Sequence, residues 1–387
     1  MHERFILCSE CGKKYPAGKQ IFRCECGNTP EIVFDYNKIK KGFREKIAKR
    51  DFNHSRYLEL YPVKKLVSIH EGGTPLIRSK NIEKSLGLKF ELYFKYEAQN
   101  PTGSFKDRGS SVEIAKAVES GAKKVVCAST GNMGASLSAY SGMANLKCVV
   151  FTPMDARIVK LEQMLAYGAD VYKVRGDYVK AARIAEEINR KRGTYLLGDY
   201  MHRREGTKSI GFELCEQLPG MDYVFSPIGN GTLISATWKA MNEFRTLGML
   251  KKRPRMVGIQ ASGCSTVARA YMKGSQIRPV KSPHTIAVAI ECGDPIDGRK
   301  ALSAINKSGG FADSVSDNDI LKTRELLARK EGLFAEPAGA VSLAGLIKNK
   351  SRVQKGSKVV CILTGHGLKT PMTGVRGKVK KPLKSML

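Results

Sequence analysis

From residue 71 onward, the sequence repeats one local pattern: a short apolar run, a glycine-bearing loop and then a stretch with helical spacing. Residues 123–129 form one such run, and the loop TGNMG and the helical segment ASLSAYSGMA follow it. Residues 222–229 begin the same order again, with the loop NGT and a second helical segment. Alternating strands and helices predict α/β layers with mostly parallel sheets. Ligands bind at the carboxyl ends of such strands, so these loops are the expected place for chemistry.

The chain carries a large excess of basic residues, which raises the question of a nucleic-acid partner. Its 66 Lys and Arg residues against 36 Asp and Glu residues give a formal net charge of +30. Residues 38–50 and 376–384 concentrate part of the excess, and neither segment interleaves aromatic side chains for base stacking. No recognition-helix motif accompanies them. A solvated basic surface is therefore the preferred interpretation, and nucleic acid is not expected as a partner.

The sequence lacks the apolar segments that membranes and secretion require. Its longest apolar run, residues 338–347, is about half of the ~20 residues that cross a bilayer. The N-terminal sequence MHERFILCSECG has no apolar segment after a basic start, as a secretion signal would have. We therefore expect a cytoplasmic protein without a membrane partner.

Four cysteines near the N-terminus are spaced as metal ligands. Cys8 and Cys11 form one pair and Cys24 and Cys26 a second, each followed by a glycine that permits a tight turn. Four thiolates favour a structural, tetrahedral zinc ion. The second pair has one intervening residue where two are usual, so free thiols in a degenerate ribbon remain the alternative. The other cysteines, at 127, 148, 215, 264, 292 and 361, are expected in the core.

Three loops carry candidate site chemistry. NPTGSFKDRG, residues 100–109, places Lys106 at a helix start beside Arg108, where the ammonium form is disfavoured and an amine nucleophile is favoured. The loops 129–134 and 227–232 follow strands and offer backbone N–H groups and hydroxyls to an anion. Neither loop fits GxGxxG or GxxxxGK[ST], which argues against a dinucleotide or a P-loop nucleotide. Two anion loops and one amine indicate a ligand with two anionic groups.

Five segments, taken in order, resemble one known family. They are EGGTPL (71–76), NPTGSFKDRG (100–109), STGNMGAS (129–136), PIGNGT (227–232) and TGHGLKT (364–370). Together they resemble threonine synthase, in the fold-type II group of pyridoxal-phosphate enzymes, from about residue 5 to residue 371. The resemblance implies pyridoxal 5′-phosphate as the cofactor.

The resemblance also implies an α/β architecture of two three-layer domains, as in the tryptophan synthase β family, preceded by a small zinc-ribbon-like segment. The expected bounds are 1–30 for that segment, 31–97 for an extension joining the large domain, 98–205 for the small domain and 206–387 for the large cofactor-binding domain with a basic tail. Relatives are commonly dimers, so we expect a homodimer.

For the cofactor, the resemblance assigns a role to each matching residue. Lys106 would form the internal aldimine and later move protons between the substrate carbons. Asn132 would bond the 3′-oxygen of the cofactor, and Thr364 would face its pyridine nitrogen. The cofactor phosphate would be held by Gly229, Asn230, Gly231 and Thr232.

For the substrate, the resemblance implies a small anionic amino acid. The reaction would convert O-phospho-L-homoserine and water to L-threonine and phosphate by γ-elimination and β-addition. The turn at Ser129, Thr130 and Met133 would take the substrate carboxylate. Arg157, with Ser104 and Lys160 behind it, would meet the departing phosphate.

Three departures from the family pattern fall where the distal group of the substrate is expected. Thr370 replaces the usual Asp, residues 154–157 replace a common Gly-Lys pair, and Met133-Gly134 replaces a frequent Thr-Ser. A related enzyme for another phosphorylated amino acid therefore remains an alternative, such as a cysteate synthase using O-phosphoserine and sulfite. A threonine dehydratase is less favoured because of FKDRG and GHGLK. From a different class, the alternative is a non-catalytic zinc-ribbon protein that binds RNA.

Overall fold

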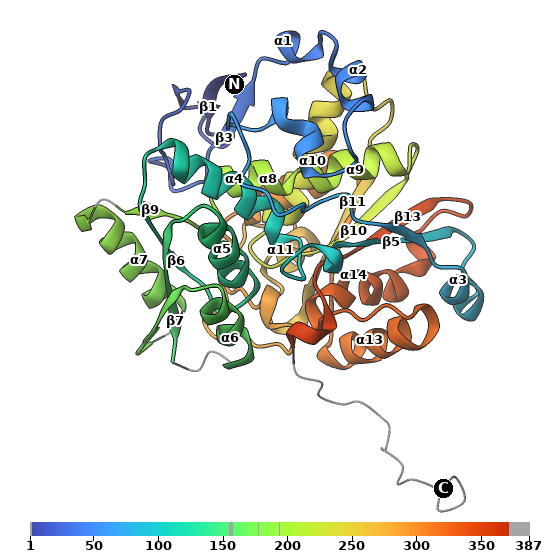
Figure 1. Ribbon diagram of the computed structural model, residues 1–387. Helices are drawn as coiled ribbons and strands as arrows, with labels where there is room; N and C mark the ends of the chain where they lie inside the picture. The colour runs from blue at the N-terminus through green and yellow to red at the C-terminus, as the bar shows by residue number, and fades with distance from the viewer. Residues whose placement is uncertain (1, 155–157, 177, 193, 371–387) are drawn as a thin grey trace, which may run out of the picture.

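The computed structural model describes residues 2–154, 158–176, 178–192 and 194–370, whose strands form three sheets (Figure 1). The first sheet is small and antiparallel, with the order β2-β1-β3. Its strands are β1 (Glu3–Leu7), β2 (Lys14–Pro16) and β3 (Glu31–Phe34). The short helices α1 (Tyr36–Lys40) and α2 (Phe43–Ala48) and a 3₁₀ segment, His54–Leu60, follow it.

The second sheet has six strands in the order β12-β11-β10-β13-β5-β4. All neighbouring pairs are parallel except β4 with β5. The strands are β4 (Leu76–Arg78), β5 (Glu91–Tyr96), β10 (Tyr223–Pro227), β11 (Arg255–Ala261), β12 (Phe311–Val315) and β13 (Lys358–Leu363). Because β5 lies early in the sequence and pairs with β13, the segment before Lys106 is brought beside the carboxyl end of β13.

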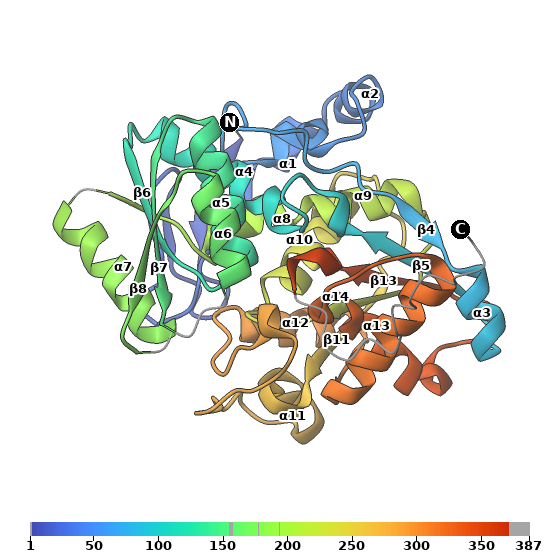
Figure 2. The ribbon, with the colours of Figure 1, turned by 60° about the horizontal axis from the view of Figure 1, so that its bottom comes forward.

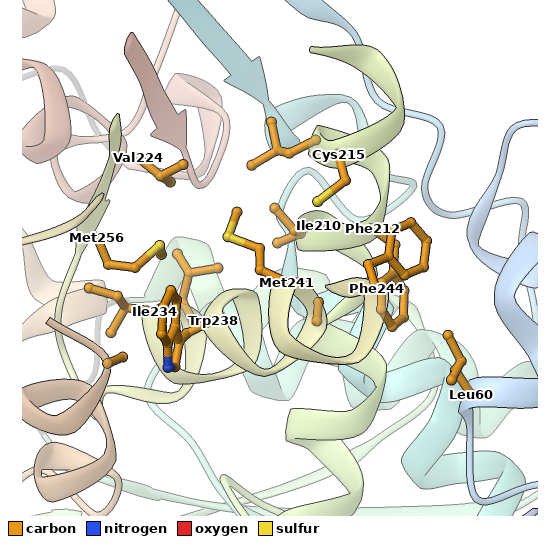
Figure 3. Close-up of a cluster of buried hydrophobic side chains, with 14 of the residues drawn as sticks. Leu60, Ile210, Phe212, Cys215, Val224, Ile234, Trp238, Met241, Phe244 and Met256 are labelled. Carbon is orange, nitrogen blue, oxygen red and sulfur yellow. The ribbon is translucent and has the colours of Figure 1, made fainter. Parts of the chain in front are cut away.

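Helices cover both faces of the six-stranded sheet. On one face, Val224 and Met256 pack with α9 (Ser209–Gln217), α10 (Thr232–Thr246) and α12 (Gly298–Ser308), and Figure 3 shows the core around Met241 and Trp238. On the other face, residues one position away along the strands pack with α3 (Lys80–Leu86), α13 (Asp317–Glu331) and α14 (Pro337–Lys348). This alternation is the two-residue period of a strand buried on both sides.

The third sheet has four parallel strands in the order β8-β7-β6-β9. They are β6 (Lys124–Ala128), β7 (Lys147–Pro153), β8 (Asp170–Val174) and β9 (Tyr195–Leu196). One face packs against α4 (Lys106–Glu119), α5 (Asn132–Met143) and α6 (Ile158–Ala166), and the other against α7 (Tyr178–Arg192). In Figure 2, α5 and α6 lie on the side of this sheet that faces the larger body, and α7 lies on the outer side.

The remaining helices are α8 (Met201–Thr207), which packs closely against α4, and α11 (Thr266–Lys273), which packs against β12. The predicted α/β class is confirmed, with two helix-covered sheets after a small cysteine-bearing segment. No helix among the described residues is long and apolar enough to span a bilayer.

Candidate active site

Three segments far apart in the sequence pair through their backbones at the carboxyl end of β13. The amide of Phe105 donates to the carbonyl of Thr364 at 3.1 Å, and Ser104 forms a β-bridge with Gly365. The amide of Glu336 donates to the carbonyl of Gly365 at 2.9 Å. The loop before α4, the loop after β13 and the start of α14 therefore form one framework.

Lys106 is the first residue of α4, so this framework fixes the point from which its side chain extends. The Lys106 side chain is 17% exposed, and its Nζ atom lies 3.7 Å from Oδ1 of the buried Asp199. Burial lowers the pKa of Lys106, while the Asp199 carboxylate opposes that shift. An amine whose charged form is disfavoured is suited to act as a nucleophile or a base.

Asp107 holds the loop that leads into α4. Its carboxylate accepts hydrogen bonds from the amide of Thr102 at 2.7 Å, from the Thr102 hydroxyl at 2.6 Å and from the Ser136 hydroxyl at 2.6 Å. Burial raises the pKa of Asp107 to about 6, although these donors favour its ionised form. The two bonds from Thr102 hold the loop itself, and the bond from Ser136 links it to α5.

Beneath the start of α4 lies a buried ion network made of Arg108, Glu97, Glu213 and Lys95. Arg108 donates to Glu97 at 2.6 Å and to Glu213 at 2.5 Å, and Lys95 donates to Glu213 at 2.6 Å, with all four side chains at 0% exposure. Burial disfavours the charge on Arg108, but Glu213 and Glu97 raise its pKa well above the usual value. The network anchors the helix that presents Lys106.

Asn132, the first residue of α5, faces a carboxylate that the sequence analysis did not identify. Its Nδ2 atom donates to Glu336 at 2.8 and 3.0 Å, while its buried Oδ1 atom has no hydrogen-bond partner among the described residues. A side chain at Gly365 would collide with the Glu336 carboxylate and lie 3.4 Å from Asn132 Nδ2. Glu336 directly precedes Pro337 at the start of α14, which is the one local signal that marks it.

The turn before α5 is organised around Ser129. Its hydroxyl oxygen accepts hydrogen bonds from the amides of Gly131 at 3.2 Å and Gly134 at 2.8 Å. A Cβ at Gly134 would lie 2.6 Å from the end of the Met164 side chain and 3.0 Å from Ser129 Cβ, so a larger residue there would have to displace the Met164 side chain. The Met133 side chain packs into the core of the four-stranded sheet, and Thr130 is half-buried. Met133 can therefore contribute to a ligand site only through its backbone.

The loop after β10 leads into α10 through Gly229, Asn230, Gly231 and Thr232. Gly231 has φ +89° and a Cβ there would lie 2.7 Å from the carbonyl oxygen of Asp297, so this position needs glycine. The Thr232 hydroxyl at the helix start is buried and has no hydrogen-bond partner among the described residues. A helix N-terminus with unpaired donors suits an anion.

Two further hydroxyls near the framework are buried without a partner. Thr364 follows β13 and is 4% exposed, and Ser104 precedes α4 and is 0% exposed. Neither side-chain oxygen has a hydrogen-bond partner in the described part of the chain. Since buried hydroxyls are almost always hydrogen-bonded, these atoms are free to bind a ligand.

The residues expected to meet the distal group of the substrate are only partly described. Arg157 lies outside the described residues, and Lys160 lies in α6 with its side chain outside the description. Near the start of the Lys106 loop, the ammonium of Lys369 donates to the carbonyl of Thr102 at 2.6 Å and to Gln163 at 2.5 Å. Through Gln163, these bonds join α6 to the loop after β13.

The four predicted metal ligands meet at one point. The sulfur atoms of Cys8, Cys11, Cys24 and Cys26 all lie within 4.8 Å of one another. Gly12 and Gly27, which follow the two pairs, have φ of +75° and +83°, as the tight turns require. Four clustered thiols fit a tetrahedral zinc ion.

The cysteine-bearing segment is joined to the glycine loop through Asp297. The Thr29 hydroxyl donates to Asp297 at 2.5 Å, and Arg204 donates to the same oxygen atom at 2.7 Å. The amide of Asp297 in turn donates to the carbonyl of Asn230 at 2.8 Å. One buried carboxylate therefore contacts both the segment with the cysteines and the loop at the start of α10.

Comparisons with known proteins identify the class. The sequence matches the family described as pyridoxal-phosphate dependent enzymes over residues 67–365. Solved structures with this fold include maize serine racemase, with a TM-score of 0.67 and 23% identity over 76% of this chain and 88% of that one. A processed threonine deaminase isoform from Solanum lycopersicum has a TM-score of 0.67 and 20% identity over 92% of this chain and 95% of that one.

The curated relatives narrow the class. A threonine synthase from Methanocaldococcus jannaschii is 46% identical, covering 97% of this chain and 95% of its own length. A threonine synthase from Methanosarcina acetivorans is 40% identical, covering 95% of this chain and 93% of its own length. The chain belongs to the threonine synthase family of pyridoxal-phosphate dependent enzymes.

Proposed function

We propose that this enzyme converts O-phospho-L-homoserine and water to L-threonine and phosphate, with Lys106 as the residue that holds the cofactor. The observation that carries the proposal is a set of buried polar atoms that have no hydrogen-bond partner among the described residues and that lie on the loop before α4, on the loop after β13 and at the starts of α5 and α10. They are the side-chain oxygens of Ser104, Asn132, Thr232 and Thr364. Because an unpaired buried polar group is costly, these four atoms support a bound polar ligand. The threonine synthase relatives support the reaction.

The residues fit pyridoxal 5′-phosphate group by group. The loop from Gly229 to Thr232 offers a helix N-terminus and an unpaired hydroxyl to the phosphate. Asn132, whose Nδ2 atom donates to Glu336 and whose Oδ1 atom has no partner among the described residues, offers its side chain to the 3′-oxygen, and Thr364 offers its hydroxyl to the pyridine nitrogen. When bound, the cofactor supplies the electron sink that makes the substrate C–H bonds acidic. A hydroxyl partner leaves that nitrogen less protonated than a carboxylate would, which suits elimination and replacement chemistry.

On the substrate side, the chain's own residues orient the molecule and move its protons. The Lys106 amine would remove protons from the substrate carbons and return one to the product. The turn at Ser129, Thr130 and Met133 would hold the carboxylate through backbone N–H groups at the start of α5. Arg157, Ser104 and Lys160 would stabilise the departing phosphate.

The substrate is tested by supplying the purified, cofactor-loaded enzyme with O-phospho-L-homoserine. We expect equal amounts of phosphate and threonine, and neither product from the variant Lys106→Ala. Activity confined to O-phosphoserine and sulfite would contradict this proposal and assign a cysteate synthase. A chain that stays colourless with added cofactor and instead binds RNA tightly, with sequence preference at moderate salt, would overturn the enzyme function.

We also propose that Cys8, Cys11, Cys24 and Cys26 bind one structural zinc ion. The convergence of four sulfur atoms within 4.8 Å supports this. Metal analysis of the purified chain should find about one zinc per chain, and Cys24→Ser should lose it while Cys215→Ser, a core cysteine, keeps it. A zinc content near zero in the unaltered protein would contradict the site.

Finally, we propose that the enzyme works in the cytoplasm as a homodimer. Each chain would contain the small and large domains expected from the sequence, 98–205 and 206–387. The dimeric state rests on the family resemblance. Light scattering should give twice the mass of one chain at micromolar concentration. The mass of a single chain under those conditions would contradict the proposal.

A further inference from the structure

Asp199 is the carboxylate nearest to Lys106, and no motif in the sequence marks it. It lies between β9 and α8 and is 6% exposed. Its Oδ1 atom is 3.7 Å from Lys106 Nζ and 4.0 Å from Arg203 Nε, and it accepts no hydrogen bond from the described residues. Its Oδ2 atom accepts a hydrogen bond from Asn230 Nδ2 at 2.6 Å. One carboxylate thus contacts both the candidate catalytic lysine and the glycine loop.

The other charged groups around Lys106 are committed elsewhere. The guanidinium of Arg203 pairs with Glu113 and also donates to the carbonyl of Gly198 and the hydroxyl of Ser110 at 3.3 Å. Glu113 accepts a hydrogen bond from the amide of Gly198 at 3.1 Å as well as the pair with Arg203. Asp199 is therefore the anion that remains to balance a charge on Lys106.

The Oδ2 atom of Asp199 is held by an uncharged side chain, Asn230. Asn230 donates to Asp199, and its own Oδ1 atom accepts from the thiol of Cys292 at 3.0 Å. Burial raises the pKa of Cys292 to about 12, so this thiol stays protonated and acts as a donor. Burial also disfavours the charge on Asp199, but Lys106 and Arg203 lower its pKa below the usual range. Asp199 stays ionised at neutral pH.

We propose that Asp199 is a positioning residue for the reaction: it stabilises the positive charge on Lys106 whenever that amine carries a proton. The inference rests on the proposed function, in which Lys106 takes protons from substrate carbons. The proton passes from the carbon to Nζ and later returns to carbon, and Asp199 itself gains or loses none. By favouring the ammonium form, the carboxylate strengthens Lys106 as a base and draws the freed amine toward the glycine loop.

The test compares Asp199→Asn with Asp199→Ala. Asparagine keeps an oxygen that can accept from Asn230 but removes the charge, whereas alanine removes both. In the full chain without cofactor, the pH dependence of Lys106 acetylation by acetic anhydride, measured by peptide mass spectrometry, reports the pKa of the amine. We expect both variants to lower that pKa by about one unit. In the loaded enzyme, we expect both to reduce kcat about tenfold or more.

Cofactor affinity separates the two variants. Asp199→Ala should weaken it by about tenfold, and Asp199→Asn should change it less. The matched control is Asp170→Asn, because Asp170 also faces a lysine, Lys147, at 3.1 Å but lies on β8 at the edge of the four-stranded sheet. It should leave the titration of Lys106 and kcat unchanged.

The inference is overturned if Lys106 has the same pKa in Asp199→Asn as in the unaltered chain. It is also overturned if Asp170→Asn lowers that pKa as much as Asp199→Asn does. The labelling experiment needs no bound cofactor. If the chain formed no coloured complex with pyridoxal phosphate, the proposed function would fail, while the labelling would still decide whether Asp199 sets the proton affinity of Lys106.

Discussion

Two polar regions meet at the start of α4, and they differ in whether their buried groups are paired. Below it, Arg108, Glu97, Glu213 and Lys95 are fully buried and every charge has a partner within 2.6 Å. In the second region, the hydroxyls of Thr364, Thr232 and Ser104 and the Oδ1 atom of Asn132 are buried and have no hydrogen-bond partner among the described residues. The paired network stabilises the fold. The unpaired groups lack hydrogen-bond partners in the described chain and can gain them from a bound ligand.

Lys106, at the boundary of the two regions, should give the largest effect. Lys106→Ala removes the amine that would hold the cofactor and move protons, so kcat/KM should fall on the order of 10⁴-fold. The visible absorbance band of a lysine-bound cofactor should also disappear. The free energy of unfolding should change little, because the ion pair of Lys106 with Asp199 is long, at 3.7 Å.

Absorbance spectra, steady-state kinetics and denaturant unfolding of the same preparation test this expectation. Lys123→Ala, a change at an exposed lysine, is the control and should behave as the unaltered enzyme does. A Lys106→Ala enzyme that keeps both the band and its activity would remove Lys106 from the site.

The network should respond to substitution through stability. Glu213→Gln leaves Arg108 and Lys95 without their shared counter-ion, and breaking a buried pair costs about 3–5 kcal/mol. Denaturant unfolding should show that loss. Glu91→Gln, at a partly exposed ion pair with Arg78 3.6 Å long, should cost under about 1 kcal/mol. Similar losses of unfolding free energy for the two variants would show that the buried network stabilises the fold no more than an exposed ion pair does.

Stability should also depend on pH through His54, which is fully buried and contacts Ser209 at 2.9 Å. Burial lowers the pKa of His54 to about 4, below its usual value of 6.5. The unfolded chain then binds the proton more readily, so this stabilisation is complete above pH 6.5 and is lost as the pH falls toward 4.

The difference in unfolding free energy between the unaltered enzyme and His54→Asn isolates this contribution. It should shrink by about 2 kcal/mol from pH 7 to pH 5, because 1.5 pH units correspond to about that energy. Since His202 is present in both proteins, its own titration cancels in the difference. A difference independent of pH would show that His54 has the same pKa in the folded and the unfolded chain.

Local pattern was sufficient to predict the strands and the loops that follow them. The run 123–129 is β6, 222–229 contains β10, and both glycine loops open helices. These features depend on how apolar residues are spaced along one segment. That spacing follows the two-residue period of a strand or the 3.6-residue period of a helix.

Features that depend on distant segments were missed. Glu336 meets Asn132 from 204 positions away, and Asp199 reaches Lys106 across 93 positions, which no local spacing encodes. The position of Arg108 in the sequence also predicts that it disfavours the ammonium form of Lys106. That prediction was wrong: burial is the largest cause, and Arg108 is paired with Glu97 and Glu213.

The most direct test of the comparison replaces one unpaired and one paired threonine by the isosteric valine. The hydroxyl of Thr364 is buried and has no partner in the described part of the chain, whereas that of Thr237 is buried and donates to the carbonyl of Leu233 at 2.9 Å. Unfolding without cofactor and the dissociation constant of pyridoxal phosphate are measured for both variants. Thr364→Val should weaken cofactor binding by about tenfold and leave stability unchanged, while Thr237→Val should lose about 1 kcal/mol of stability and keep cofactor affinity. Equal losses of stability with unaltered cofactor affinity in both would contradict the account.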